Sequence, residues 1–264
     1  MISNTGRQKI ILKSPWEIEK VRVSNEIVAE VLQTLRERVR PGVATIELDE
    51  LAVKLTRQRN AEPAFLGYRG YPFSLCVSVN EEVVHGMPSK ERILKEGDIV
   101  SLDFGVIRDG YYGDAAITLP VGNVSEAAGV LVRTTEEALY SGIEKATVGN
   151  RLFDISHAIQ GCAEREGFSV VRQFVGHGIG ASLHEGPEVP NYGQAGQGIR
   201  LQAGMVLAIE PMVNAGGYEV RILSDGWTAV TKDGNLSAHF EHCVAITENG
   251  PRVLSRLNTP KERR

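Results

Sequence analysis

The sequence lacks any run approaching the roughly 18 consecutive apolar residues that a membrane-spanning helix needs. Its start, MISNTGRQKIILKSPW, contains no apolar stretch as long as that of a secretory signal peptide. These two absences argue against a membrane partner and against export. We therefore expect a cytoplasmic protein.

Basic residues are no more plentiful than acidic ones, with 29 Lys and Arg against 33 Asp and Glu and a net charge of −4 at pH 7. Binding to a phosphate backbone normally needs a basic surplus, so we expect no direct nucleic-acid binding. Cysteine is scarce, since the chain has only three and no Cys-x-x-Cys motif. An odd number of widely spaced cysteines argues against a disulfide framework and predicts buried free thiols at Cys76, Cys162 and Cys243.

The rest of the composition is that of a soluble globular protein, because 42% of the residues are hydrophobic and 23% are charged. At 264 residues, the folded chain can bury about three quarters of the surface that it exposes when unfolded. No proline-rich or serine-rich linker divides the sequence. We therefore predict a single domain over residues 1–264.

Helical and strand-like patterns occur twice in the same order. Ser14, Pro15 and Glu17 form a strong helix start signal, and Thr45 and Ser125 can cap further helices. With the apolar spacing they predict helices at about 15–39, 45–59, 125–146 and 150–166. Strand-like segments follow each pair of helices, at 74–79, 99–106 and 168–175. The order favours a mixed α+β fold.

Two pairs of similar segments share one spacing. Gly42 and Gly149 each precede a helix. Asp103 and Glu210 each end a segment that begins with a glycine and continues with mainly apolar residues. The members of both pairs are 107 positions apart. The shared spacing predicts an internal duplication, with halves at about 14–121 and 122–254 related by a pseudo-twofold axis. Chance similarity between two common kinds of segment is the alternative. If the halves are related, Asp103 and Glu210 face each other at the axis.

Four carboxylates lie in or at the start of apolar, strand-like segments: Asp103, Asp114, Glu210 and Glu241. Burying an unpaired carboxylate is costly, and few arginines lie nearby in the sequence, so these groups need another cation. His177 lies between two glycines, which permit close approach of the backbone. Four carboxylates and one imidazole suit a pair of divalent ions, with Mn, Fe or Co favoured and Zn possible. For any one of these acids alone, a surface or ion-paired carboxylate is the alternative.

A set of short motifs occurs in a characteristic order: Val84-His85-Gly86-Met87-Pro88, Asp103, Asp114, Gly176-His177-Gly178-Ile179-Gly180, His184, Ile209-Glu210-Pro211-Met212 and Phe240-Glu241-His242. Together these motifs resemble type I methionine aminopeptidase, and the resemblance extends from Ser14 to about Val253. It implies the α+β pita-bread fold, in which pseudo-twofold duplicated halves build an antiparallel sheet with flanking helices. It also implies a dinuclear metal centre.

The resemblance assigns a role to each candidate ligand. Asp114 and Glu241 would bridge the two metal ions. Asp103 would bind one of them, and His177 and Glu210 would bind the other.

The same resemblance places His85 and His184 beside the substrate. A structural histidine with satisfied hydrogen bonds would be the alternative for each of them if it stood alone. His157 and His239 match none of the motifs, and we expect both to be structural or exposed.

The implied reaction removes the N-terminal methionine from nascent proteins and peptides whose second residue is small. Two metal ions about 3.5–4 Å apart lower the pKa of a shared water, which attacks the scissile carbonyl. Glu210 would accept the proton of that water, while His85 and His184 would hydrogen-bond the amide and the tetrahedral centre. We expect a monomer that acts on nascent chains at the ribosome.

By resemblance, a pocket for the methionine side chain has mainly apolar and aromatic walls with one thiol: Phe65, Tyr68, Tyr71, Cys76, Leu183 and Trp227. Such walls suit a thioether. Bacterial relatives often carry a smaller residue at the position of Phe65 and an aromatic one at the position of Leu183. Both departures leave the shape of the pocket, and so the choice of second residue, open.

Two other classes of protein share this fold. A prolidase or proline-specific aminopeptidase usually has a large preceding domain, a second histidine where this chain has Ala181, and an arginine shortly before the last glutamate. The second histidine and the arginine are absent from these positions, and we expect no preceding domain. A metal-free binding protein should have lost metal ligands, whereas all five are present. The physiological metal cannot be read from the sequence.

Overall fold

The structure is a computed structural model that describes residues 10–256, and these residues form four α-helices and three β-sheets. The helices are α1 (Pro15–Arg36), α2 (Thr45–Gln58), α3 (Glu126–Ile143) and α4 (Leu152–Arg165). A short 3-10 turn, η1 (Tyr68–Gly70), follows α2. All four predicted helices are present, and each ends slightly before its predicted last residue.

The start of α1 has the predicted capping box. The Ser14 side chain accepts a hydrogen bond from the Glu17 backbone N–H, and the Glu17 carboxylate accepts one from the Ser14 N–H at 2.8 Å. Ser125 caps α3 by accepting a hydrogen bond from a backbone N–H in the first turn. Both serines satisfy donors that have no partner inside the helix, so the sequence alone locates these helix starts.

Two local predictions were wrong. Thr45 does not cap α2, because the N-cap residue is Ala44 and the Thr45 hydroxyl instead exchanges hydrogen bonds with the backbone of Ser89. The predicted strand at 168–175 is only β6 (Ser169–Val170), because its pairing with β10 (Met212–Asn214) covers those two residues alone. In both places a tertiary contact overrides the local pattern.

A nine-stranded sheet forms the centre of the molecule, and its neighbouring strands pair antiparallel. Its main path runs β1-β4-β5-β14-β9-β7-β8, while β2 pairs with β4 and β15 pairs with β14. The strands are β1 (Glu62–Pro63), β2 (Leu75–Val79), β4 (Ile99–Arg108), β5 (Tyr111–Pro120), β7 (Gly176–Gly178), β8 (Glu185–Val189), β9 (Val206–Ile209), β14 (Glu241–Thr247) and β15 (Gly250–Val253). Strands from the two halves of the chain therefore meet where β5 pairs with β14.

Two three-stranded sheets complete the fold. In one, β10 pairs with β6 and with β13 (Ser237–His239). In the other, β12 (Ala229–Thr231) pairs with β11 (Val220–Ile222) and β3 (Glu82–Val84). All pairings in both are antiparallel.

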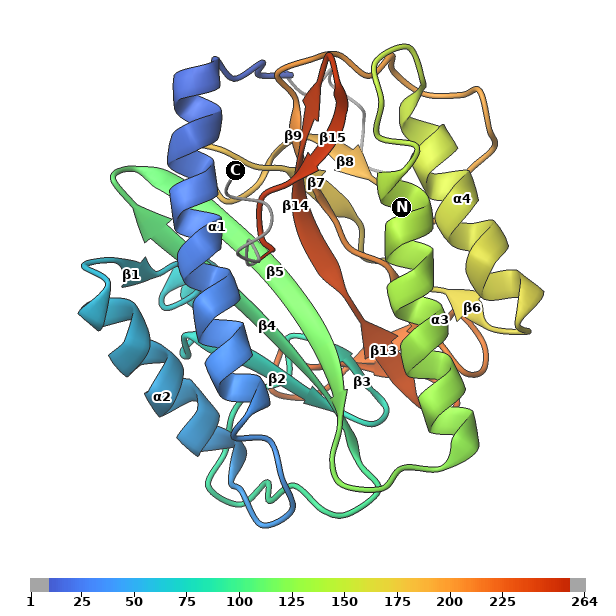
Figure 1. Ribbon diagram of the computed structural model, residues 1–264. Coiled ribbons are helices and arrows are strands. Elements are labelled where there is room, and N and C mark those ends of the chain that lie inside the picture. The colour runs from blue at the N-terminus through green and yellow to red at the C-terminus, as the bar shows by residue number, and fades with distance from the viewer. Residues whose placement is uncertain (1–9, 257–264) are drawn as a thin grey trace.

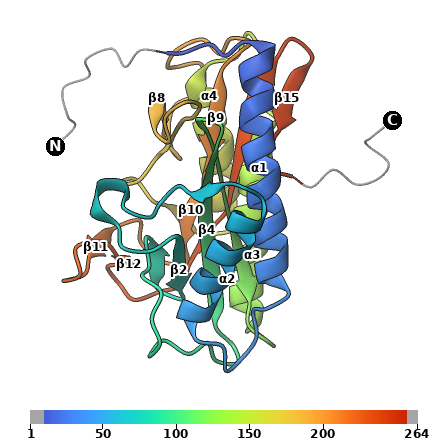
Figure 2. The ribbon, with the colours of Figure 1, turned by 90° about the vertical axis from the view of Figure 1, so that its left-hand side faces the viewer.

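The four helices lie on one face of the central sheet (Figure 1). A view turned by 90° shows β11 and β12 on the opposite side of the sheet from α1 and α3 (Figure 2). The core lies between helices and sheet: Leu102 and Phe104 of β4 pack in one cluster with residues of α1 and α2. Since neighbouring residues of a strand point to opposite faces, Asp103 points away from the helices.

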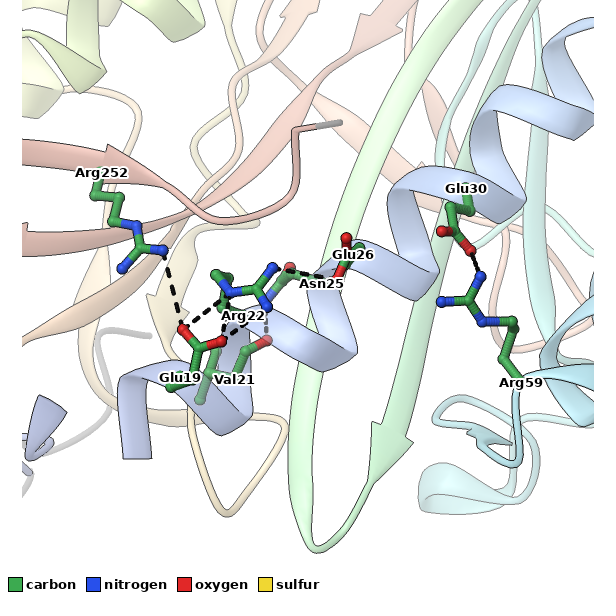
Figure 3. Close-up of polar contacts among 8 residues, drawn as sticks. All are labelled: Glu19, Val21, Arg22, Asn25, Glu26, Glu30, Arg59 and Arg252. Atoms are coloured by element: carbon green, nitrogen blue, oxygen red, sulfur yellow. Dashed lines mark hydrogen bonds and ion pairs between the residues drawn. The ribbon is translucent and has the colours of Figure 1, made fainter. Parts of the chain in front are cut away.

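Charged residues on the exposed face of α1 form ion pairs with one another and with residues of neighbouring elements (Figure 3). Arg22 pairs with Glu19 at 2.8 Å and with Glu26 at 3.1 Å, and Arg59 at the end of α2 pairs with Glu30. Exposed pairs of this kind each contribute at most about 1 kcal/mol, so they do not determine the position of α1.

The buried face of α1 is fixed to β5 by Asn25. Its side-chain amide donates to the carbonyl of Val21 at 2.9 Å (Figure 3), and its oxygen accepts the backbone N–H of Asp114 at 3.2 Å. Gly113 permits this approach, because a Cβ there would lie 2.6 Å from the backbone nitrogen of Asn25. Thus α1 holds the backbone of β5 beside one of the predicted metal ligands.

The structure confirms the predicted α+β fold, with an antiparallel sheet and flanking helices. Cys76, Cys162 and Cys243 are buried and free, as predicted. Among residues 10–256 no helix combines the length and the apolar character that a membrane span requires.

Candidate active site

The predicted metal ligands come from strands that are consecutive in the central sheet. Asp103 is in β4, Asp114 is in β5, Glu241 begins β14, Glu210 directly follows β9 and His177 is the middle residue of β7. In the strand register one residue, Ala116, lies opposite both Asp103 and Glu241. All five predicted ligands line a single cavity.

Several carboxylate oxygens in this cavity have no hydrogen-bond partner although they are buried: Asp103 Oδ1, Asp114 Oδ1 and Glu241 Oε1. One ligand atom from each of Asp114, His177 and Glu241 lies within 4.8 Å of the other two. Buried polar atoms are normally paired, and an unpaired anionic oxygen is especially unfavourable. The cluster therefore has the composition and the free oxygens that a bound cation would satisfy.

Burial raises the pKa of all four carboxyl groups. Desolvation alone raises the pKa of Asp103 to about 7. Desolvation and then the neighbouring carboxylates raise the pKa values of Asp114, Glu210 and Glu241 well above the usual range. A divalent cation among them would have the opposite effect, because a nearby positive charge favours the ionised form.

His177 has the tautomer and direction of a metal ligand. Its Nδ1–H donates to the carbonyl of Gly178 at 2.9 Å, which leaves the Nε2 lone pair free. Nε2 faces Glu210 Oε1 at 3.5 Å and Asp114 Oδ2 at 4.0 Å. Desolvation lowers the pKa of His177 to about 4, so the ring is neutral at pH 7.

The glycines beside His177 permit close approach of the backbone, as predicted. A Cβ at Gly176 would lie 2.4 Å from the carbonyl oxygen of Ala208 in β9. A Cβ at Gly178 would lie 2.3 Å from that of Gly186 in β8. Larger residues would push β7 away from both neighbouring strands and move the imidazole out of the cavity.

The donor set fits a divalent metal ion. Four carboxylates, three of them with an unpaired buried oxygen, and one imidazole with a free Nε2 are typical ligands for Mn, Fe, Co or Zn. No thiolate takes part, because burial keeps the pKa of Cys76, the thiol that lines the cavity, well above its usual range. This excludes the cysteine-rich ligand set of many structural zinc sites.

His85 and His184 line the same cavity. Desolvation lowers the pKa of His85 to about 4 and that of His184 to about 3, so both rings are neutral at pH 7 and can donate or accept one hydrogen bond. The Tyr68 hydroxyl lies 2.7 Å from His184 Nδ1, and the two rings stack. His85 has a φ of +59° and packs edge-on against Phe174.

An apolar part of the cavity is lined by every residue predicted for the methionine pocket: Phe65, Tyr68, Tyr71, Cys76, Leu183 and Trp227. The rings of Tyr71 and Trp227 pack edge to face, with their centroids 5.2 Å apart. The Phe65 ring lies over Gly105 of β4, where an added Cβ would be only 2.6 Å from the ring. The glycine at 105 therefore provides part of the space for the Phe65 ring.

Two residues near the site were not predicted from the sequence. Arg69 lines the cavity and lies 5.3 Å from the ring of Tyr68. His239 is buried, and its Nε2 lies 3.7 Å from Glu210 Oε2. His239 ends β13 and Glu241 begins β14 of another sheet, so strand alternation along the sequence gave no signal that would have placed His239 beside the site. His157, by contrast, is exposed as expected.

The fold and the carboxylate cluster define a metal-dependent class of protein, and the comparison with known families specifies it. Residues 19–248 match the family described as Metallopeptidase family M24. The chain belongs to metallopeptidase family M24.

Within this family the similar proteins are methionine aminopeptidases. The methionine aminopeptidase of Clostridium acetobutylicum is 54% identical over 246 residues, which cover 93% of this chain and 98% of that protein. Methionine aminopeptidase 1 of Bacillus subtilis is 52% identical over 248 residues, which cover 94% of this chain and 100% of that protein. The crystal structure of the methionine aminopeptidase of Thermotoga maritima matches with a TM-score of 0.93 at 48% identity. The match covers 94% of this chain and 100% of that chain. The predicted resemblance is confirmed.

Prolidases share the fold at lower similarity. The prolidase of Pyrococcus furiosus has a TM-score of 0.77 at 23% identity, and the match covers 66% of its chain. This agrees with the extra domain expected of that group and demonstrates only a common fold.

Proposed function

We propose that this chain removes the N-terminal methionine from nascent proteins and peptides whose second residue is small. The proposal rests mainly on one observation: buried carboxylates with unpaired oxygens lie beside an apolar, aromatic pocket in the same cavity. The names of the similar proteins support the same reaction. The cavity thus combines a place for a metal ion with a place for a thioether side chain.

We assign two divalent ions, Co, Mn, Fe or Zn, to the carboxylate cluster. Asp114 and Glu241 would bridge the ions, Asp103 would complete the ligands of one, and His177 and Glu210 would complete those of the other. When bound, such ions lower the pKa of water and stabilise the oxyanion formed on a peptide carbonyl. The four negative charges of the carboxylates balance the four positive charges of two divalent cations.

The side chains of the cavity orient the peptide and move its protons. Glu210 accepts the proton of the attacking water, since its carboxylate faces the cavity from the end of β9. His85 and His184 donate hydrogen bonds to the scissile peptide group, where their neutral rings stabilise the developing negative charge. The Tyr68 hydroxyl fixes the ring plane of His184.

We also propose the cellular setting and organisation. The protein would act as a cytoplasmic monomer on nascent chains at the ribosome, without direct contact to nucleic acid, as its net charge of −4 suggests. Residues 1–264 would form one catalytic domain from halves at about 14–121 and 122–254. Each half contributes two helices followed by strands of the central sheet, which supports the duplication.

Initial rates on a series of Met-Xaa-Ser peptides test this function. Peptides with Ala, Gly or Ser in the second position should be cleaved rapidly, and those with Leu, Lys or Glu slowly. Phe65→Cys should accelerate cleavage of the larger second residues if the Phe65 ring narrows the site. One methylene group in a pocket is worth only about 1–3 kcal/mol, so discrimination among the small second residues should be graded. Cleavage of Xaa-Pro peptides without methionine would contradict the proposal and indicate prolidase activity.

A further inference from the structure

His239 lies beside the proposed metal site, and the proposed mechanism does not use it. Its side chain is only 1% exposed, and neither Nδ1 nor Nε2 has a hydrogen-bond partner. A buried imidazole normally makes at least one hydrogen bond, so a ring with two unpaired nitrogens needs an explanation. Its nearest charged neighbour is Glu210, with Nε2 3.7 Å from Oε2.

The backbone of His239 is held firmly in place. Its N–H donates to the Thr118 hydroxyl at 2.8 Å, and that hydroxyl lies 2.7 Å from the His239 carbonyl oxygen. In β13, His239 also pairs with Met212 of β10. Its neighbour Ala238 packs into the core with α3 and α4, so the imidazole points to the other side of the strand, toward the cavity.

Glu210 therefore lies between two imidazoles. Its Oε1 faces His177 Nε2 at 3.5 Å, and its Oε2 faces His239 Nε2 at 3.7 Å. A carboxylate that binds a metal ion through one oxygen is normally held by a hydrogen bond to the other. His239 Nε2 needs to come less than about 1 Å closer to Oε2 to reach hydrogen-bonding distance. Hydrogen bonds in active sites commonly shorten by such an amount in the bound state.

We propose that His239 is a positioning residue for Glu210, with its Nε2–H donating to Oε2 so that Oε1 is presented to the metal ion. The inference rests on the proposed metal centre, because it assigns Glu210 as a ligand. His239 does not touch the substrate. Its rigid attachment to Thr118 and β10 fixes the orientation of the Glu210 carboxylate before a metal ion arrives.

A matched pair of substitutions separates this role from simple packing. Gln and Met have straight side chains of similar shape, but only Gln retains an N–H donor that can reach Oε2. Mn²⁺ is the suitable probe, because the soft thioether of Met is a poor ligand for it. The readout is the dissociation constant of Mn²⁺ from the metal-depleted full-length chain, measured by isothermal titration calorimetry, together with the number of ions bound.

His239→Met should weaken Mn²⁺ binding by about 10-fold to 100-fold, the usual effect of losing a hydrogen bond to a ligand, whereas His239→Gln should stay within about threefold of the unsubstituted protein. The exposed His157→Met is the control and should change nothing. Thermal unfolding of each metal-free variant checks its fold, and His239→Leu replaces His239→Met if the latter is unfolded.

Equal Mn²⁺ affinity in His239→Met and the unsubstituted protein would overturn the inference while leaving the metal centre intact. Equal weakening in His239→Gln and His239→Met would also overturn it, because the imidazole itself, not an N–H donor, would then be required. If the unsubstituted protein bound no Mn²⁺, Co²⁺, Fe²⁺ or Zn²⁺, the proposed metal centre would fail first and the role of His239 with it.

Discussion

At the scale of single residues, the informative feature is what the buried polar groups lack. Asp103, Asp114 and Glu241 each have an unpaired buried oxygen, and burial has raised the pKa of each of these groups. In an ordinary core such groups would be replaced or paired. A cation bound among them would explain their presence together, because it would satisfy the unpaired oxygens.

Of the three neutral histidines that line the cavity, His85 and His184 are expected to act on the substrate and not on the metal. We predict that His85→Ala and His184→Ala each lower kcat by about 10²-fold to 10⁴-fold on a Met-Ala-Ser peptide, the range typical of positioned acid-base or oxyanion groups. Metal content, measured by elemental analysis, should not change. The exposed His157→Ala is the control, and loss of metal in either variant would make that histidine a ligand instead.

At the scale of elements, the segment between β7 and β8 is held in place by a buried ion pair. Lys13, just before α1, contacts Glu185 with 2.6 Å between Nζ and Oε2, and both side chains are almost fully buried. The other carboxylate oxygen of Glu185 accepts the Ser182 N–H at 3.1 Å. Since His184 directly precedes Glu185, this pair connects the start of the fold to a residue that we propose contacts the substrate.

Breaking this pair should be costly. Lys13→Met would leave the Glu185 carboxylate buried and unpaired, and we expect a loss of about 3–5 kcal/mol in the free energy of unfolding, measured by urea denaturation. Lys20→Met is the matched control, because its pair with Asp109 is exposed, and it should change stability by at most about 1 kcal/mol. Equal small losses in both variants would show that the buried pair is dispensable.

At the scale of the whole molecule, the sheet brings together candidate metal ligands that are far apart in the sequence. The first half of the chain supplies Asp103 and Asp114 from β4 and β5, and the second half supplies Glu210, Glu241 and His177 from β9, β14 and β7. The β5 to β14 pairing is the junction between these sets. A metal ion bound there would join both halves, so metal binding and stability should be coupled.

Removal of metal tests this coupling. After exhaustive chelation we expect loss of peptidase activity and a lower Tm, because the clustered carboxylates lose the opposing charge that holds them together. Co, Mn or Fe in the low micromolar range should restore both, with one to two ions bound per chain. Full activity in protein shown to be metal-free by elemental analysis would refute the metal-dependent mechanism.

The sequence by itself determined the four helices and the α+β class, because capping signals and apolar periodicity are local. The candidate metal ligands and pocket residues were predicted from motifs that are far apart in the sequence and resemble a known family. It did not reveal that Ala44 precedes α2 or that β6 is so short, since contacts with Ser89 and β10 decide those points. Nor did it single out His239, which matches no motif. Only the pairing of β13 with β10 and the bond to Thr118 bring that imidazole to Glu210, because the neighbours of a side chain are set by the tertiary structure.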